Sequence, residues 1–194
     1  MLFSSCAIED IKNSCRGKSS VGYAYFFFDG TSAQSKLAAH ESLVRSCIMQ
    51  FSYQFDGIPP ALVDLYEDEN NSRSQPLIGA LEDTLLQILQ YFDVVYIFVD
   101  ALDECTERPK VLKWIQSVTS QTSGNLHLMV TSRPEPDIKN RLRSLTLAEI
   151  DVANQRESDD IRHYIDARLS EVDKWTQAQK KLVRDALLRG AGGV

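Results

Sequence analysis

The stretch VVYIFVDALDEC, residues 94–105, constrains the fold of this chain more than any other segment. Its apolar run VYIFV is typical of a strand buried on both faces of a parallel sheet. Asp100 directly follows this run, and Asp103 and Glu104 follow one short turn later. A carboxylate at the tip of such a strand lies at the edge where parallel sheets bind ligands. We therefore expect Asp100 to hold magnesium, and Asp103 and Glu104 to position a water molecule for attack on a terminal phosphate.

A structural alternative exists for the same residues. Asp100 would simply end the strand, and Asp103 and Glu104 would cap the following helix. A single aspartate after an apolar run does not separate these two interpretations. The full pattern, four or more apolar residues followed by D-x-x-D-E, is more specific and favours the phosphate site.

A second motif lies one helix further along the chain. NLHLMVTS, residues 125–132, predicts the next strand, and Arg133 and a proline that starts a helix follow it. The planar guanidinium of Arg133 is suited to a γ-phosphate. Taken by itself, Arg133 is better explained as a surface residue at a helix start. Its position after a strand that neighbours the first favours the functional interpretation.

Strands and helices alternate along the chain, and the clear strands, 21–28, 94–100 and 125–131, are apolar on both faces. This alternation predicts an α/β fold with a parallel sheet covered by helices on both sides. The polar segment 67–76 is expected to be an exposed loop, and 145–150 a weak additional strand. The helices are expected to bury Leu43, Val44, Cys47, Ile48 and Phe51, then Leu77, Ile78, Leu81, Leu85, Ile88, Leu89 and Phe92, then Val111, Leu112, Ile115 and Val118.

The composition excludes several classes of function. The chain has 194 residues, 43% hydrophobic and 25% charged, which suits a globular domain with a sizeable core. Its net charge of −6, without a concentrated basic face, argues against a nucleic-acid partner and a two-metal nuclease. No apolar run approaches the roughly 20 residues that a membrane span requires. A cytoplasmic location is the default expectation.

These motifs resemble those of the NACHT nucleotidases, within the signal-transduction ATPases with numerous domains (STAND), and most closely their fungal, nephrocystin-like branch. VYIFVDALDEC is similar to the Walker B motif of that family, and MVTSRPEPDI to its sensor-1 strand. The resemblance implies a nucleotide-dependent switch of P-loop NTPase type, with Asp100 on magnesium, Asp103 and Glu104 on water, and Arg133 on the γ-phosphate. It implies Mg²⁺ and ATP as cofactors, and fungal defence or self/non-self recognition as the role.

The phosphate-binding loop of this family, G-x-x-x-x-G-K-[ST], has no complete counterpart in the chain. RGKSS, residues 16–20, lacks the first glycine and a preceding strand, so we interpret it as a turn between a helix and a strand. The resemblance places Met1 just after the loop. It implies that the strands 21–28, 94–100 and 125–131 correspond to family strands 2, 3 and 4. They would then form a three-stranded sheet ordered 4-3-2, within the family order 5-1-4-3-2. It implies a partial NACHT domain over 1–194, with a sheet core over about 1–151 and trailing helices over about 152–194.

Two functions therefore remain open. One is a fragment of a nucleotide-dependent signalling ATPase, in which this chain by itself binds neither Mg²⁺ nor ATP tightly. The other is a nucleotide-independent interaction module derived from a NACHT domain, whose partners are other NACHT domains or downstream repeat domains. A rise in melting temperature with ATP and magnesium would contradict the second function, because a ligand that binds only the native state stabilises it.

Overall fold

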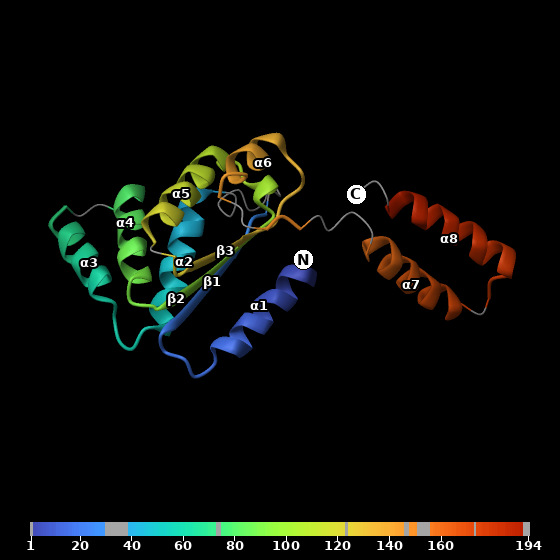
Figure 1. The fold of residues 1–194 in the computed structure, drawn as a ribbon, viewed down its shortest axis with the longest axis horizontal. Coiled ribbons are helices and arrows are strands. Elements are labelled where there is room, and N and C mark those ends of the chain that lie inside the picture. Colours follow the sequence, from blue (N-terminus) through green and yellow to red (C-terminus); the bar gives the residue numbers. More distant parts are fainter. Residues whose placement is uncertain are drawn as a thin grey trace. The chain divides into compact units, whose positions relative to one another are not determined.

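Three strands form one parallel sheet in the order β1–β2–β3, which confirms the predicted α/β class and strand order (Figure 1). The strands are β1 (Val21–Phe27), β2 (Val94–Asp100) and β3 (Leu126–Val130). In register, Phe27 lies beside Asp100, and Val99 lies beside Val130. The computed structural model describes residues 2–29, 39–72, 75–122, 124–145, 148–150, 156–172 and 174–191.

The helices fall into two compact units, Met1–Leu145 and Thr146–Val194, and the sheet belongs to the first. No helix in the described ranges is both long enough and apolar enough to cross a bilayer. The first unit contains α1 (Leu2–Cys15), α2 (His40–Gln54), α3 (Pro60–Ser72), α4 (Ile78–Leu89), the 3₁₀ turn η2 (Leu102–Glu104), α5 (Arg108–Gln121) and α6 (Pro136–Leu142). The second contains α7 (Arg156–Ser170) and α8 (Gln177–Ala191).

Two predictions about local structure are wrong. The segment 67–76 is not wholly a loop, because α3 continues to Ser72. Ala61 is buried at the start of α3, and Leu62 and Leu65 pack against the core, so this short apolar stripe anchors a helix whose polar end needs no apolar partner. The expected strand at 145–150 also does not form in the described part of that segment, where residues 148–150 are irregular.

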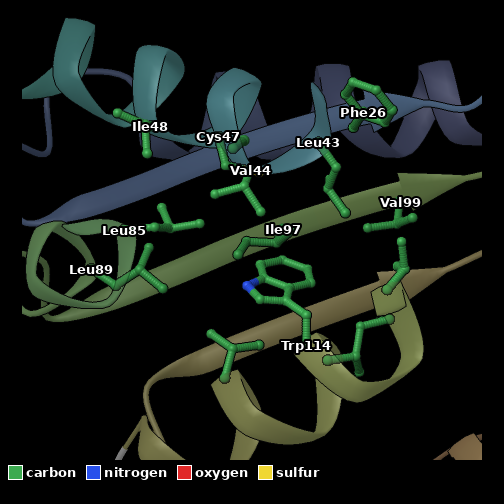
Figure 2. Close-up of a cluster of buried hydrophobic side chains, with 14 of the residues drawn as sticks. Phe26, Leu43, Val44, Cys47, Ile48, Leu85, Leu89, Ile97, Val99 and Trp114 are labelled. Carbon is green, nitrogen blue, oxygen red and sulfur yellow. The ribbon is translucent and has the colours of Figure 1, made fainter. Parts of the chain in front are cut away.

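One face of the sheet carries the main hydrophobic core (Figure 2). Ala24, Ile97 and Val99 point from the strands toward α2, α4 and α5. The predicted apolar faces supply most of the opposing side chains, and Leu43, Val44, Cys47, Phe51, Leu85, Ile88, Leu89, Val111 and Ile115 are each at most 1% exposed. Periodicity therefore identified most of the inner faces of these helices. It was wrong at the start of α4, where Leu77 is 78% exposed and Ile78 37% exposed, because Leu77 lies before the first residue of the helix.

The opposite face of the sheet is covered less completely. Helix α1 lies on this side, where its Ile8 and Cys15 are buried (Figure 1). The Lys12 ammonium lies 4.8 Å from the centre of the Tyr25 ring, a cation–π contact. His127 of β3 stacks on Tyr96 yet stays exposed. The prediction that helices cover the strands on both faces is therefore wrong for β3, and also for this face of β1, where Phe27 is 37% exposed.

Two glutamines of α2 close the outer edge of β1. The Gln54 side-chain amide accepts a hydrogen bond from the Tyr23 N–H at 3.0 Å and donates one to the Tyr23 carbonyl at 2.6 Å. One helical turn earlier, Gln50 accepts from the Tyr25 N–H at 3.1 Å and donates to its carbonyl at 2.8 Å. The two amides take the place of a neighbouring strand, which protects an edge that would otherwise pair with another chain.

The outer edge of β3 differs. β3 pairs with β2 on one side, and the described residues place no strand on its other side. Leu126, Leu128 and Val130 are only partly buried against the core. We predict that this hydrophobic edge promotes association with other chains.

Helix α2 begins at a buried histidine. The His40 side chain is 4% exposed, its ring centre lies 6.0 Å from that of Trp114, and its Nε2 lies 3.3 Å from a Glu82 carboxylate oxygen. That nitrogen nevertheless makes no hydrogen bond, so the short distance does not represent a formed ion pair. Burial lowers the pKa of His40 below 6.5, although the nearby Glu107 carboxylate acts to raise it. His40 is therefore neutral in the folded protein at neutral pH.

This histidine predicts a pH dependence of stability. Because the His40 pKa is lower in the folded state, the unfolded state takes up the proton first as the pH falls. The stability that neutral His40 contributes to the folded state is therefore lost as the pH falls below 6.5. Burial raises the pKa of Glu82, which acts in the opposite sense. We expect His40→Phe to lose less stability than the unchanged protein between about pH 7.5 and 5.5, as measured by urea unfolding. Equal losses in the two proteins would refute the assignment.

The second unit is a helical hairpin. Ile165 is buried in α7, and Arg184 of α8 forms two hydrogen bonds with the Asp166 carboxylate, at 2.6 and 3.0 Å. The sequence TQAQ, residues 176–179, predicts a capping box. Thr176 and Gln179 form it, since the Gln179 N–H donates to the Thr176 hydroxyl and the Thr176 N–H donates to the Gln179 side chain. By residue type the sequence also favours Ser158 as the N-cap of α7. Ser158 instead lies inside this helix, because the helix begins at Arg156.

Candidate functional site

The carboxyl end of the central strand carries Asp100, at the edge where the sequence predicted a ligand site. The apolar run before it forms the middle of the sheet, so backbone hydrogen bonds hold this strand on both sides. Asp100 is 8% exposed, and its carbonyl accepts a hydrogen bond from the Phe28 N–H at 3.1 Å. The carboxylate is therefore held on a rigid support at the mouth of the sheet.

Thr131 orients this carboxylate. Its hydroxyl donates a hydrogen bond to Asp100 Oδ1 at 2.5 Å and accepts one from the Ala101 N–H at 3.0 Å. Ala101 adopts the left-handed conformation with φ 54°, and this turns the chain out of the strand. The Leu102 N–H then donates to the Thr131 carbonyl at 3.0 Å. One residue of β3's exit loop therefore fixes both the carboxylate and the turn that follows it.

The sequence analysis did not identify Thr131. The sequence did carry a signal for Thr131. Thr131 directly follows the strand next to β2, and Asp100 is the last residue of β2. The parallel register that pairs Val99 with Val130 brings the two positions together. That register depends on tertiary packing, so the sequence pattern alone did not indicate the pair.

Asp103 and Arg133 are brought together by the structure. The Arg133 N–H donates to Asp103 Oδ1 at 3.0 Å, and the Arg133 Nε lies 3.5 Å from Asp103 Oδ2. Asp103 is 11% exposed and Arg133 is 75% exposed. Both oxygens of Asp103 therefore contact Arg133, which favours a role in positioning the arginine at the same edge as Asp100.

Glu104 occupies a different environment. It ends the η2 turn, its N–H donates to the Ala101 carbonyl at 2.9 Å, and its side chain is exposed. Leu102 and Cys105, on either side, are buried and anchor the turn to the core. The turn therefore presents the Glu104 side chain to solvent, while its apolar residues fix its position.

The acidic groups fit magnesium better than a metal that needs several protein ligands. In the described part of the chain, no three or more His, Cys, Asp or Glu side chains are placed to hold a metal ion together. Magnesium is commonly held by one or two carboxylates together with water and phosphate oxygens. Asp100 is suited to be such a ligand, because Thr131 fixes its orientation.

The RGKSS segment forms a turn between α1 and β1, as predicted. Gly17 adopts φ 79° in this turn. The segment precedes β1, whereas Asp100 is the last residue of β2, and parallel strands place these positions at opposite edges of the sheet. A strand of this length separates the two edges by roughly 20 Å. Lys18, the lysine of this segment, therefore cannot contact a phosphate bound at Asp100.

A comparison with protein families decides the assignment. The model of the family described as Nephrocystin 3, N-terminal, matches residues 2–133. The chain belongs to this family. The nephrocystin 3 N-terminal match runs from α1 to Arg133 in the loop after β3, so Asp100, Asp103, Glu104, Thr131 and Arg133 all lie within it. The family is associated with NACHT-type proteins. No curated protein and no solved structure matches the chain.

Removal of the Thr131 hydroxyl tests the geometry around Asp100. We expect Thr131→Val to lower the free energy of unfolding by about 1–3 kcal/mol, because the Asp100 carboxylate and the Ala101 N–H both lose a partner. Thr131→Ser keeps the hydroxyl and should cost less than Thr131→Val. Chemical denaturation of the three proteins measures both effects, and equal stability of the Val and Ser variants would rule out a role for the hydroxyl.

Proposed function

We propose that the carboxyl edge of the sheet is the magnesium side of a nucleoside-triphosphate site in a NACHT-type switch protein. The observation that carries the proposal is the buried Asp100 at the tip of the central strand, oriented by the Thr131 hydroxyl. Membership of the nephrocystin 3 N-terminal family supports it, because that family is associated with NACHT-type proteins.

The residues at this edge take different roles in the proposal. Asp100 holds magnesium, which when bound neutralises charge on the phosphate oxygens. Glu104, exposed at the end of η2, orients a water molecule toward the terminal phosphate. Arg133 contacts the γ-phosphate through its exposed guanidinium. Asp103 holds Arg133 in position. We expected from the sequence that Asp103 would act on the water molecule, and the proposal gives it this positioning role instead.

We further propose that this chain by itself does not hydrolyse ATP. Its sequence holds no complete G-x-x-x-x-G-K-[ST] motif, and the backbone amides and lysine of that motif are what bind the phosphates. We propose that the site serves as a nucleotide-dependent switch in fungal defence or self/non-self recognition. Nucleotide and adjoining NACHT or repeat domains would be its partners in the cytoplasm.

The alternative is a nucleotide-independent interaction module. One observation favours it: both oxygens of Asp103 contact Arg133, so this pair is satisfied internally without a phosphate. In that case the edge is purely structural, and Asp100 has no affinity for magnesium beyond that of any surface carboxylate.

Paramagnetic NMR distinguishes these functions in the chain as it stands. Mn²⁺ prefers the same oxygen ligands as Mg²⁺ and broadens nearby amide signals. We expect titrated Mn²⁺, with ATP present, to broaden the signals of Asp100–Glu104 and Thr131–Arg133 first, and Asp100→Asn to abolish this selectivity. Asp137→Asn is the matched control, since Asp137 lies on the surface of α6, where it pairs with Arg108, and its loss should leave the broadening pattern unchanged. A broadening pattern that is unchanged by Asp100→Asn would favour the interaction module.

A phosphate-release assay tests the second statement. We expect no ATP turnover above a buffer blank. Turnover that disappears in Glu104→Gln would show that the chain is an active ATPase and would overturn the proposal that it is inactive by itself.

A further inference from the structure

An open groove lies at the amino edge of the sheet, opposite the Asp100 edge. Its volume is about 640 Å³, within the range of small-ligand sites. Residues from α1, the RGKSS turn, the start of β1 and the end of α2 line it. Three of these residues are cations, Lys12, Arg16 and Lys18, and one is an acid, Glu9. The lining is therefore positive in a chain whose net charge is −6.

The three cations are available to a ligand. In the part of the chain that the structure describes, no carboxylate lies within ion-pair distance of Lys12, Arg16 or Lys18. Lys12 instead lies over the Tyr25 ring, which holds an ammonium without neutralising it. Most other arginines of the first unit with a described environment, such as Arg45, Arg108 and Arg133, lie against carboxylates.

The turn itself has a satisfied backbone. The Arg16 N–H donates to the Asn13 carbonyl and the Lys18 N–H donates to the Cys15 carbonyl, so carbonyls at the end of α1 are occupied within the turn. Cations near a helix end often serve only to balance its dipole, and Lys12 is suited to that role. Arg16 and Lys18 lie beyond the last residue of α1, so the dipole explains them less well.

The groove also has rigid walls and neutral hydrogen-bonding groups. The Gln54 amide is held by two hydrogen bonds to the Tyr23 backbone, which fixes one wall. Asn13 and Ser19 add a side-chain amide and a hydroxyl. An arginine fork, lysine point charges and small polar groups together are the set that binds phosphate oxygens.

We infer that this groove binds a small ligand with two or more phosphate groups, without magnesium. Three unpaired cations match a polyanion better than a single phosphate. Magnesium would neutralise the ligand and compete with the cations, so binding should be stronger in its absence. The proposal is independent of the nucleotide site proposed above, because that site lies at the other edge of the sheet and depends on magnesium.

Calorimetric titration with pyrophosphate, ATP and inorganic phosphate in EDTA tests the inference. We expect pyrophosphate and ATP to bind more tightly than phosphate, and raising the salt from about 50 to about 300 mM to weaken binding. The double variant Arg16→Gln, Lys18→Gln should weaken binding about tenfold or more, because charge-assisted contacts are lost. ATP binding much tighter than pyrophosphate would indicate that Tyr23 also contacts the nucleoside, and equal binding that the phosphates alone are recognised.

Two control variants make the result decisive. Lys113→Gln with Arg143→Gln removes the same charge from exposed positions outside the groove and should leave binding unchanged. Asp100→Asn should also leave it unchanged. The melting temperature without ligand and an amide NMR spectrum show whether the Arg16, Lys18 variant is folded. Absence of millimolar binding, equal effects of both double variants, or binding that requires magnesium and is lost in Asp100→Asn would each overturn the inference.

Discussion

Phe51→Ala is expected to lower the free energy of unfolding of the sheet-containing unit by about 3–5 kcal/mol. Phe51 is 0% exposed, and its ring centre lies 5.6 Å from that of Phe92. Gly22 of β1 leaves room for both rings, since a Cβ there would lie 2.9 Å from Phe92 and 3.0 Å from Phe51. Loss of the Phe51 ring therefore leaves a cavity between α2, β1 and the end of α4, which the backbone of the sheet cannot close.

Tyr53→Ala is the matched control, because Tyr53 lies on the same helix and is 83% exposed. It should change stability by about 0.5 kcal/mol or less. Urea unfolding followed by Trp114 fluorescence, in a Trp175→Phe background, reports on the first unit alone, since Trp175 belongs to the second. Similar losses for Phe51→Ala and Tyr53→Ala would show that α2 does not pack on the sheet as described.

Joint replacement of Gln50 and Gln54 by methionine is expected to lower the free energy of unfolding by about 2–6 kcal/mol. Four hydrogen bonds to the backbone of Tyr23 and Tyr25 are lost, at about 0.5–1.5 kcal/mol each. Methionine has a similar length and a good helix propensity, so α2 itself should persist. The outer edge of β1 becomes free to pair with another chain, and we expect association that increases with protein concentration.

Gln87→Met is the control for this pair, because Gln87 is exposed on α4 and its loss should leave stability and association unchanged. Denaturation measures the stability, and light scattering over a range of protein concentrations measures the association. If the double variant stays monomeric and as stable as the control, the glutamine amides do not protect the edge.

Local patterns in the sequence predicted the elements that rest on local physics. The apolar run before Asp100 indicated a buried strand, and the spacing of apolar residues around Phe51 indicated the inner face of α2, because backbone periodicity decides which side chains share a face. The missing first glycine and preceding strand marked RGKSS as a turn. Thr176 and Gln179 indicated a capping box because both partners lie within one turn of the chain.

Polar tracts were predicted less well. The polar composition of segment 67–76 predicts a loop, yet α3 extends into this segment as far as Ser72. Hydrophobic periodicity is informative only where apolar residues recur, and a helix whose last turns are polar in sequence carries no such signal there. Leu62 and Leu65, near the beginning of this helix, pack against the core and hold the helix in place. That contact is a property of the tertiary structure.

The sequence by itself determined that carboxylates would follow a buried strand and that an arginine would follow its neighbour, because each motif lies within a single segment. Only the tertiary structure decided which groups meet at that edge. The Thr131 hydroxyl reaches Asp100, and the Arg133 backbone and side chain both reach Asp103, across about 30 residues of chain. The same holds for the glutamine amides that close β1. These contacts depend on strand register and on the orientation of a helix, which are decided by how the whole core packs.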